Sequence, residues 1–177
     1  MTTLYTTTAT AHGGRDGRVA TDDGLLDVRV TPPKELGGPG GATNPEQLFA
    51  AGFAACFHSA LSLVARRARQ DVTGSTVTAQ VGLSRIEGGV GYQLGVHLIA
   101  DLPGVPEDVA RDLVAKADAV CPYTNATRGN IPVSHEVRTA ALTNCSRVRG
   151  RCRSVAPRAR CTATAPRRRS GARSRSR

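Results

Sequence analysis

The longest apolar stretch of the chain runs from Gln47 to Ala65 and contains no charged residue. Its large apolar side chains fall on every face of a helix, and a helix that is apolar all round is expected to be buried all round. Asn44 is a favourable N-cap, Pro45 suits the first helical turn, and Gln47 completes a capping box. The pattern therefore predicts a central, buried helix that contains Cys56.

This stretch is nearly as long as a membrane span, which needs about 20 apolar residues. Gln47, Gly52, His58 and two serines dilute the run, and Glu46 lies at one end. We therefore expect the central helix of a soluble domain, with no membrane partner.

The segment before this helix is predicted to be β-structure followed by a loop. Residues 2–11 are threonine-rich, and residues 19–31 are typical of two short strands around an Asp-Asp-Gly turn. The run 31–42 contains three prolines and four glycines, so no regular element is expected there.

The segment after the helix is predicted to begin with a β-hairpin and to continue with a second helix. Apolar residues alternate over 77–83 and again over 92–100, which indicates a hairpin with one buried face. Pro106 suits the first turn of a helix whose apolar positions run to Cys121, and Pro122 ends it. Cys121 is therefore expected at a helix terminus.

The last part of the body is predicted to be a polar loop over 123–130 and one more strand around 131–137. Strands joined as hairpins, without regular βαβ alternation, are typical of an α+β fold. We predict antiparallel β-sheets packed around two central helices.

Charge is distributed unevenly along the chain. The formal net charge is +10, yet residues 1–142 carry 12 basic and 14 acidic side chains, a net charge of −2. The other 12 basic residues are arginines of the last segment, which has almost no large apolar side chain and cannot bury enough surface to order itself. We predict one domain over 1–142 and a disordered arginine-rich tail over 143–177.

The basic tail suggests an alternative function, because arginines attract phosphate whatever the fold. It has no interleaved aromatic residues and no groove-reading motif, so we expect no specific nucleic-acid partner. A nonspecific nucleic-acid-binding protein remains the alternative from another functional class.

The chain contains five cysteines, an odd number, with two in the body and three in the tail. The polar N-terminus lacks the pattern of a secretory signal, so we predict a cytoplasmic location, where reactive thiols are favoured over a disulfide framework. Cys56 and Cys121 are either a peroxidatic and resolving pair or small core residues. Their separation of 65 residues, with no CxxC motif, favours the core interpretation when taken alone.

The sequence around each cysteine changes that balance. Three segments of the chain carry a recognisable family pattern: GGRDG at 13–17, GGPGGATNPEQLFAAGFAACF at 37–57 and VCPYTNATRGNI at 120–131. Through these segments the chain resembles the organic hydroperoxide resistance proteins, the Ohr branch of the Ohr/OsmC family, over residues 1–138. Family members end soon after the strand that follows RGNI. The tail at 143–177 departs from this pattern and is typical of translation in another reading frame or of an artefactual extension.

The resemblance implies a thiol-dependent peroxidase with an OsmC-like fold. Cys56 would attack the O–O bond of an organic hydroperoxide and become a sulfenic acid, and Cys121 would condense with it to a disulfide. Arg15 would stabilise the thiolate, and Glu46 would hold the arginine by an ion pair. The alternatives are a solvated loop residue for Arg15 and a helix N-terminal acid for Glu46.

The family also implies an external dithiol reductant, lipoyl groups on cytoplasmic proteins, and no bound cofactor. The four histidines show no ligand spacing, so no metal is expected. A thiol redox sensor would use the same cysteines but would turn over only once.

Four apolar residues of the helix are candidates for a substrate-binding wall that favours alkyl or fatty-acid hydroperoxides over hydrogen peroxide. They are Phe49, Phe53, Phe57 and Leu61. The alternative is that they are ordinary core side chains.

Helix geometry predicts that the site is shared between two chains. Glu46 and Cys56 are 10 residues apart on one helix, which places them roughly 15 Å apart along its axis. A glutamate side chain does not span that distance, so either the helix breaks near Gly52 or the glutamate comes from a second subunit. We predict an intertwined two-fold homodimer that combines Cys56 of one chain with Glu46 of the other.

Overall fold

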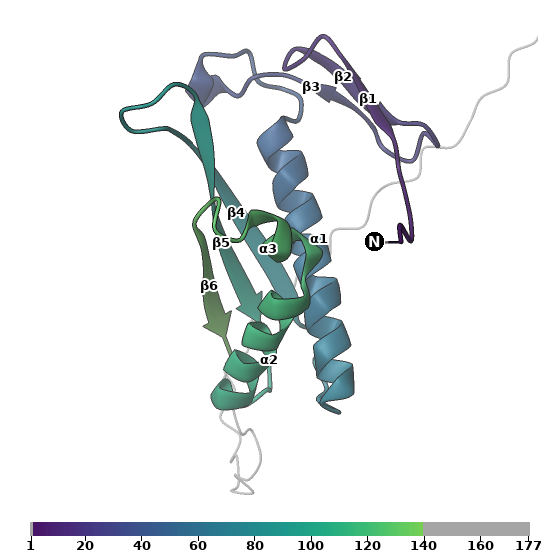
Figure 1. Cartoon of the computed structure of the whole chain (residues 1–177), viewed down its shortest axis with the longest axis vertical. Coiled ribbons are helices and arrows are strands. Elements are labelled where there is room, and N and C mark those ends of the chain that lie inside the picture. Colours follow the sequence, from purple (N-terminus) through teal and green to yellow (C-terminus); the bar gives the residue numbers. More distant parts are fainter. Residues whose placement is uncertain (1, 140–177) are drawn as a thin grey trace, which may run out of the picture. The chain divides into compact units, whose positions relative to one another are not determined.

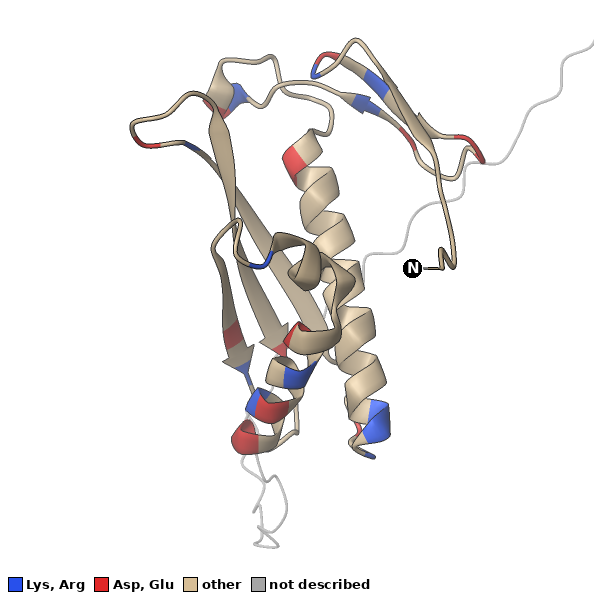
Figure 2. Ribbon diagram, viewed as in Figure 1, with Lys and Arg blue, Asp and Glu red and all other residues tan. Residues whose placement is uncertain are grey.

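The central helix predicted from the sequence is present and unbroken. In the computed structural model, which describes residues 2–139, helix α1 spans Pro45–Arg67 (Figure 1). The backbone N–H of Gln47 donates to the Asn44 side chain over 2.8 Å, so the predicted N-cap forms. Charged residues occur on α1 only near its two ends (Figure 2).

One face of α1 is exposed in the single chain, so the expectation of burial all round is wrong for one copy. The buried side chains are Phe53, Phe57, Ala60, Leu61, Val64 and Ala65. They belong to a core that also contains residues of β5 and α2. Ala51, Ala55, Ser59 and Leu63, which are spaced by four residues, are exposed. The reason is that, within residues 2–139, the other elements cover only one side of this helix.

Among residues 2–139, α1 is the one helix long and apolar enough to cross a membrane, judged by length and composition alone. Its buried face packs into the hydrophobic core against β4 and α2. Core helices of globular domains have the same composition, so this property does not require a membrane.

The N-terminal residues form a three-stranded antiparallel sheet, as predicted. Its strands are β1 (Ala9–His12), β2 (Gly17–Thr21) and β3 (Asp27–Val30), in the order β1-β2-β3. The turn between β1 and β2 carries Arg15. A Cβ atom on Gly17 would lie 1.9 Å from the carbonyl oxygen of His12, so this tight turn requires glycine.

The proline- and glycine-rich loop that follows contains one short element that was not predicted. Residues Lys34–Leu36 form a single 3₁₀ turn, which Gly37 ends in a left-handed conformation at φ 78°. A 3₁₀ turn needs only three residues and tolerates flanking prolines, so local composition does not exclude it.

The second sheet contains the predicted hairpin and the last strand. Strands β4 (Thr76–Arg85) and β5 (Tyr92–Asp101) pair antiparallel, and β6 (Val133–Arg138) joins β5 at the edge. The pairing of β6 with β5 is parallel, which differs from the expectation of antiparallel sheets throughout. The two helices between β5 and β6 form a crossover that returns the chain to the same end of the sheet.

Helix α2 spans Glu107–Val120, and Cys121 is its C-cap, at the helix terminus as predicted. The polar loop expected over 123–130 is wrong in part, because Pro122–Thr127 form a short helix, α3. Cys121 has an extended backbone at φ −70° and ψ 122°, and Pro122 then occupies the first helical position, where its fixed φ is favourable. A single residue, Cys121, therefore separates the two helices.

These elements confirm the α+β class, with two sheets and the helices α1 and α2. The predicted tail at 143–177 and the domain boundary at residue 142 lie outside the described residues and stay predictions.

Candidate functional site

The two body cysteines, which are 65 residues apart in sequence, lie side by side in the fold. Cys56 is in the middle of α1, and Cys121 is at the junction of α2 and α3. Their Sγ atoms are 3.7 Å apart, and both are free thiols. Because an S–S bond is about 2.05 Å long, a movement of roughly 2 Å or less would allow a disulfide.

Cys121 is fully buried, whereas Cys56 is only partly buried. Of the two thiols, Cys56 is thus the one that a molecule from solvent can reach first. The order that the family resemblance implies, with Cys56 reacting first and Cys121 second, stays a prediction.

Arg15 and Glu46 also meet, from the β1–β2 turn and the first turn of α1. The guanidinium donates two parallel hydrogen bonds, from Nη1 to Oε2 over 3.0 Å and from Nη2 to Oε1 over 2.6 Å. Bidentate pairing of this kind is strong and fixes the orientation of both groups. The hydrogen bond from Arg15 lowers the pKa of Glu46 below its ordinary value, and the same contact raises the pKa of Arg15.

Within one chain these two pairs form separate clusters. Glu46 lies in the first turn of α1, and Cys56 lies ten residues further along an unbroken helix. At 1.5 Å per residue the separation is roughly 15 Å along the axis. A break of the helix near Gly52 is therefore excluded, and the ion pair of one chain does not reach the thiol of the same chain.

The surroundings of Cys56 in one chain disfavour its thiolate. Burial is the largest influence and raises the pKa of the Cys56 thiol above its ordinary value. The backbone N–H of Tyr123 acts in the opposite direction and lowers the pKa, whereas hydrogen bonding with Cys121 raises it further. A buried thiol becomes an effective nucleophile when a cation reverses the effect of burial. Arg15 does not influence the Cys56 pKa within the single chain.

Two of the four predicted wall residues form an aromatic cluster with a residue that the sequence analysis missed. Tyr123 stacks on Phe49 with ring centroids 6.0 Å apart and meets Phe53 edge-on at 5.6 Å. Phe49 and Phe53 are themselves edge-on at 5.8 Å. The available signal was the position of Tyr123, two residues after Cys121 and inside the VCPYTNATRGNI motif.

The other two predicted wall residues take the position of ordinary core side chains. Phe57 and Leu61 have no exposed surface, and the Phe57 ring lies 5.4 Å from that of His135. Both belong to the central hydrophobic cluster of the chain. Their placement corresponds to the core interpretation that the sequence left open.

Comparisons with known proteins agree with this architecture. Residues 38–136 match the family model described as OsmC-like protein. The chain is 49% identical over 133 residues to the organic hydroperoxide resistance protein of Xanthomonas axonopodis pv. citri, which covers 74% of this chain and 92% of that protein. It is 50% identical over 139 residues to organic hydroperoxide resistance protein OhrA of Bacillus subtilis, covering 76% and 96% respectively.

The chain belongs to the OsmC-like family, in its organic hydroperoxide resistance branch.

Solved structures of this branch share the fold. An organic hydroperoxide resistance protein from Elizabethkingia anophelis superposes with a TM-score of 0.75 at 52% identity, covering 79% of this chain and all, 100%, of that one. OhrB of Bacillus subtilis gives a TM-score of 0.71 at 40% identity, covering 77% and 100%. The OsmC-like fold predicted from the sequence is therefore confirmed.

Other titratable groups of this OsmC-family protein form surface contacts. His97 lies 2.8 Å from the Ser134 hydroxyl and 3.2 Å from a Glu136 carboxylate oxygen, and His135 lies 3.2 Å from Asp118. Within residues 2–139, no group of three His, Cys, Asp or Glu side chains is arranged to hold a metal ion.

Proposed function

We propose that this protein is a cysteine-based peroxidase that reduces organic hydroperoxides to alcohols and so gives resistance to oxidative stress. The observation that carries the proposal is the contact of 3.7 Å between the partly buried Cys56 and the buried Cys121. The names of relatives near 50% identity support the peroxide-resistance role.

The chemistry proceeds in two steps. The Cys56 thiolate attacks the terminal oxygen of the hydroperoxide, the O–O bond breaks, and the released alkoxide takes a proton and leaves as an alcohol. Cys56 is then a sulfenic acid, and Cys121 displaces its hydroxyl group as water to form a disulfide. An external dithiol, for which we propose lipoyl groups of a cytoplasmic protein, restores both thiols. No bound cofactor takes part in these steps.

We propose that the cation needed at Cys56 comes from a second copy of the chain. Three observations support a two-fold homodimer with shared sites. Among residues 2–139 of its own chain, no basic side chain contributes to the pKa shift of the Cys56 thiol, the Arg15–Glu46 pair is preformed but roughly 15 Å away, and α1 leaves an exposed stripe. Arg15 of one subunit, held by Glu46, then stabilises the thiolate of the other.

The aromatic cluster suits an apolar substrate. Phe49 and Tyr123 are partly exposed and lie on the same side of α1 as Cys56. Burial of an apolar substituent against these rings favours alkyl hydroperoxides over hydrogen peroxide, which has no apolar surface to bury.

The test is steady-state removal of an organic hydroperoxide with a dithiol reductant. Wild-type protein should turn over many times and prefer the organic substrate to hydrogen peroxide. Cys56→Ser should lose essentially all activity, because the remaining groups at the site do not attack oxygen. Cys145→Ser, in the tail, is the matched control and should keep full activity.

Two outcomes would contradict the proposal. Substantial turnover in Cys56→Ser would exclude Cys56 as the nucleophile. A wild-type protein that consumed only one equivalent of hydroperoxide, even with excess dithiol, would instead indicate a redox sensor.

A further inference from the structure

The ring of Tyr123 rests directly on the backbone of α1 at Gly52. A Cβ atom placed on Gly52 would lie 2.9 Å from Tyr123 Oη, 3.2 Å from Cε2 and 3.4 Å from Cζ. A contact at 2.9 Å is shorter than side chains tolerate, so any residue except glycine would displace the ring. Gly52 lies one helical turn before Cys56 on the same side of α1.

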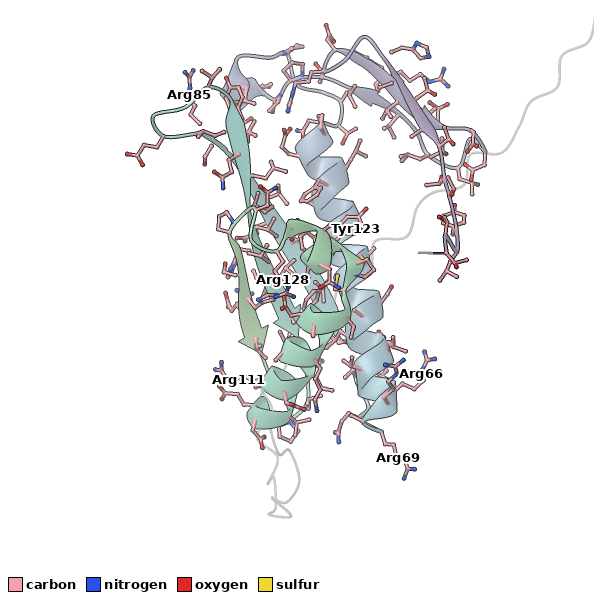
Figure 3. The ribbon with its side chains drawn as sticks, in the orientation of Figure 1. Arg66, Arg69, Arg85, Arg111, Tyr123 and Arg128 are labelled. Carbon is pink, nitrogen blue, oxygen red and sulfur yellow. The ribbon has the colours of Figure 1, made fainter. Side chains whose placement is uncertain are left out.

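Phe49 and Phe53 hold the same ring from two further directions. Tyr123 stacks on Phe49 and meets Phe53 edge-on, and Phe53 is itself fully buried. Figure 3 labels Tyr123 at the beginning of α3, beside α1. Fixed on three sides, the ring sets the position of α3 relative to α1.

The position of α3 in turn controls Cys121. Tyr123 is only two residues from Cys121, and Pro122 between them has a restricted backbone. A displacement of the Tyr123 ring is therefore passed along a short, stiff segment to the Cys121 sulfur, which now lies 3.7 Å from that of Cys56.

We propose that Gly52 and Tyr123 are positioning residues for the disulfide step. This inference rests on the proposed function. The Tyr123 ring rests against the α1 backbone at Gly52, and we call this contact the Tyr123 seat. The seat keeps Cys121 within reach of the Cys56 sulfenic acid. In that step the Cys121 thiolate attacks the Cys56 sulfur, the S–S bond forms, the S–O bond breaks, and hydroxide leaves and is protonated to water.

The seat matters because the sulfenic acid has two competing fates. Attack by Cys121 gives the reducible disulfide, whereas a second hydroperoxide oxidises Cys56 to sulfinic acid, which is not restored by dithiols. A displaced Cys121 slows only the first of these reactions. Loss of the seat should therefore increase over-oxidation without preventing the first attack on hydroperoxide.

The experiment compares Gly52→Ala, Tyr123→Ala and Tyr123→Phe with wild type. Gly82→Ala is the matched control, because a Cβ there meets no atom within 4 Å. Each protein is treated with increasing equivalents of an alkyl hydroperoxide, and mass spectrometry measures disulfide and sulfinic acid at Cys56. The rate of the first hydroperoxide consumption is measured in parallel by rapid mixing.

We expect disulfide formation to slow roughly tenfold in Gly52→Ala and Tyr123→Ala, since misplacement of a reacting group by about 1 Å can cost up to about 100-fold. Sulfinic acid should accumulate at fewer equivalents, as is also expected for Cys121→Ser, in which no resolving thiol competes with the second hydroperoxide. Tyr123→Phe and Gly82→Ala should match wild type, because phenylalanine keeps the ring contacts. Alanine favours helix over glycine, so a defect in Gly52→Ala is not explained by a weaker helix.

A double variant separates the specific contact from a general disturbance. With the ring removed by Tyr123→Ala, an added Cβ at Gly52 has nothing to displace, so Gly52→Ala should have no further effect. If the two effects multiply, or if Gly52→Ala alone behaves as wild type, the proposed seat is wrong.

A measurement without peroxide keeps this test independent of the proposed function. Equilibration with oxidised and reduced glutathione measures how readily the two thiols form a disulfide, and Gly52→Ala should lower that equilibrium constant about tenfold. If wild type consumed no hydroperoxide but Gly52→Ala still showed this decrease, the contact between Gly52 and Tyr123 would stand and the proposed peroxidase function would be wrong. The same equilibrium constant in wild type and Gly52→Ala would overturn the seat.

Discussion

At the scale of single residues, the ionisation of Cys56 is the feature on which the chemistry depends. Burial raises the pKa of this thiol in one chain, and the guanidinium of Arg15 is paired with Glu46, which lies roughly 15 Å from Cys56 along α1. Pairing with Glu46 does not prevent the Arg15 guanidinium from stabilising a thiolate, because the pairing fixes the direction in which the guanidinium points.

Removing Arg15 should therefore raise the pKa of Cys56. A cation within about 4 to 6 Å lowers the pKa of an acidic group by roughly 1 to 3 pH units. In Arg15→Met the thiolate fraction at a given pH should fall, and the midpoint of the alkylation rate should move to higher pH by that amount. The measurement is the rate of Cys56 alkylation by iodoacetamide against pH.

Arg18→Met is the control for this prediction. Arg18 is an exposed arginine of β2 that pairs with Asp27, so its removal also deletes one positive charge from the N-terminal sheet. An equal midpoint in Arg15→Met, Arg18→Met and wild type would exclude Arg15 as the stabilising cation.

At the scale of secondary-structure elements, the Arg15–Glu46 pair connects the first sheet to α1. The side chain of Glu46 is only 15% exposed, whereas that of Arg15 is 48% exposed, so solvent weakens the pair without abolishing it. We place its contribution to stability at about 1 kcal/mol or less.

This contribution should depend on pH in one direction. The hydrogen bond from Arg15 lowers the folded-state pKa of Glu46, so the pair stabilises the fold above the ordinary pKa of a glutamate and the stabilisation is lost as the pH falls through the folded pKa. Glu46→Gln should flatten the decrease of melting temperature between about pH 5 and pH 2. Glu107→Gln, in an exposed pair with Arg111, should leave it unchanged. An identical decrease in Glu46→Gln and wild type would contradict the assignment.

The elements differ in how far local sequence determines them. Helix α1 has a cap, a first-turn proline and a long apolar run, and the hairpin has strict alternation, so both were predicted. Helix α3 is six residues long, too short for a periodic pattern. The direction of β6 is set by the crossover through α2 and α3, and its own residues do not encode it.

For the site residues too, local sequence determines which residues take part, whereas tertiary packing determines how far apart they lie. Cys56 and Cys121 were found from the motifs around them, as were Arg15 and Glu46. Their pairing distances depend on how α1 packs against α2 and on where the β1–β2 turn folds back, which are tertiary properties. The seat of Tyr123 on Gly52 is also tertiary, because a glycine in a helix carries no local sign of what lies on it.

At the scale of the whole molecule, the proposed function combines the preformed ion pair of one chain with the thiol pair of another. This predicts complementation between two inactive proteins. Cys56→Ser lacks the nucleophile, and Glu46→Ala lacks the group that orients Arg15. Under conditions where subunits exchange, mixing them should produce heterodimers with one intact site and restore up to about a quarter of wild-type activity in an equal mixture, since half of the dimers are mixed.

The control is a mixture of Cys56→Ser with Cys121→Ser. Both cysteines lie in the same half of a site and come from the same chain, so mixed dimers contain no complete site. A monomer by sedimentation, or no recovery when exchange is shown independently, would reject the shared site.

The most direct test of the peroxidase mechanism is a single turnover without reductant, followed by peptide mapping. With one equivalent of an alkyl hydroperoxide, we predict one equivalent of alcohol per chain and a disulfide that joins Cys56 to Cys121. Consumption of hydroperoxide that leaves Cys56 as an alkylatable thiol, or that joins Cys56 to a tail cysteine such as Cys145, would contradict the account.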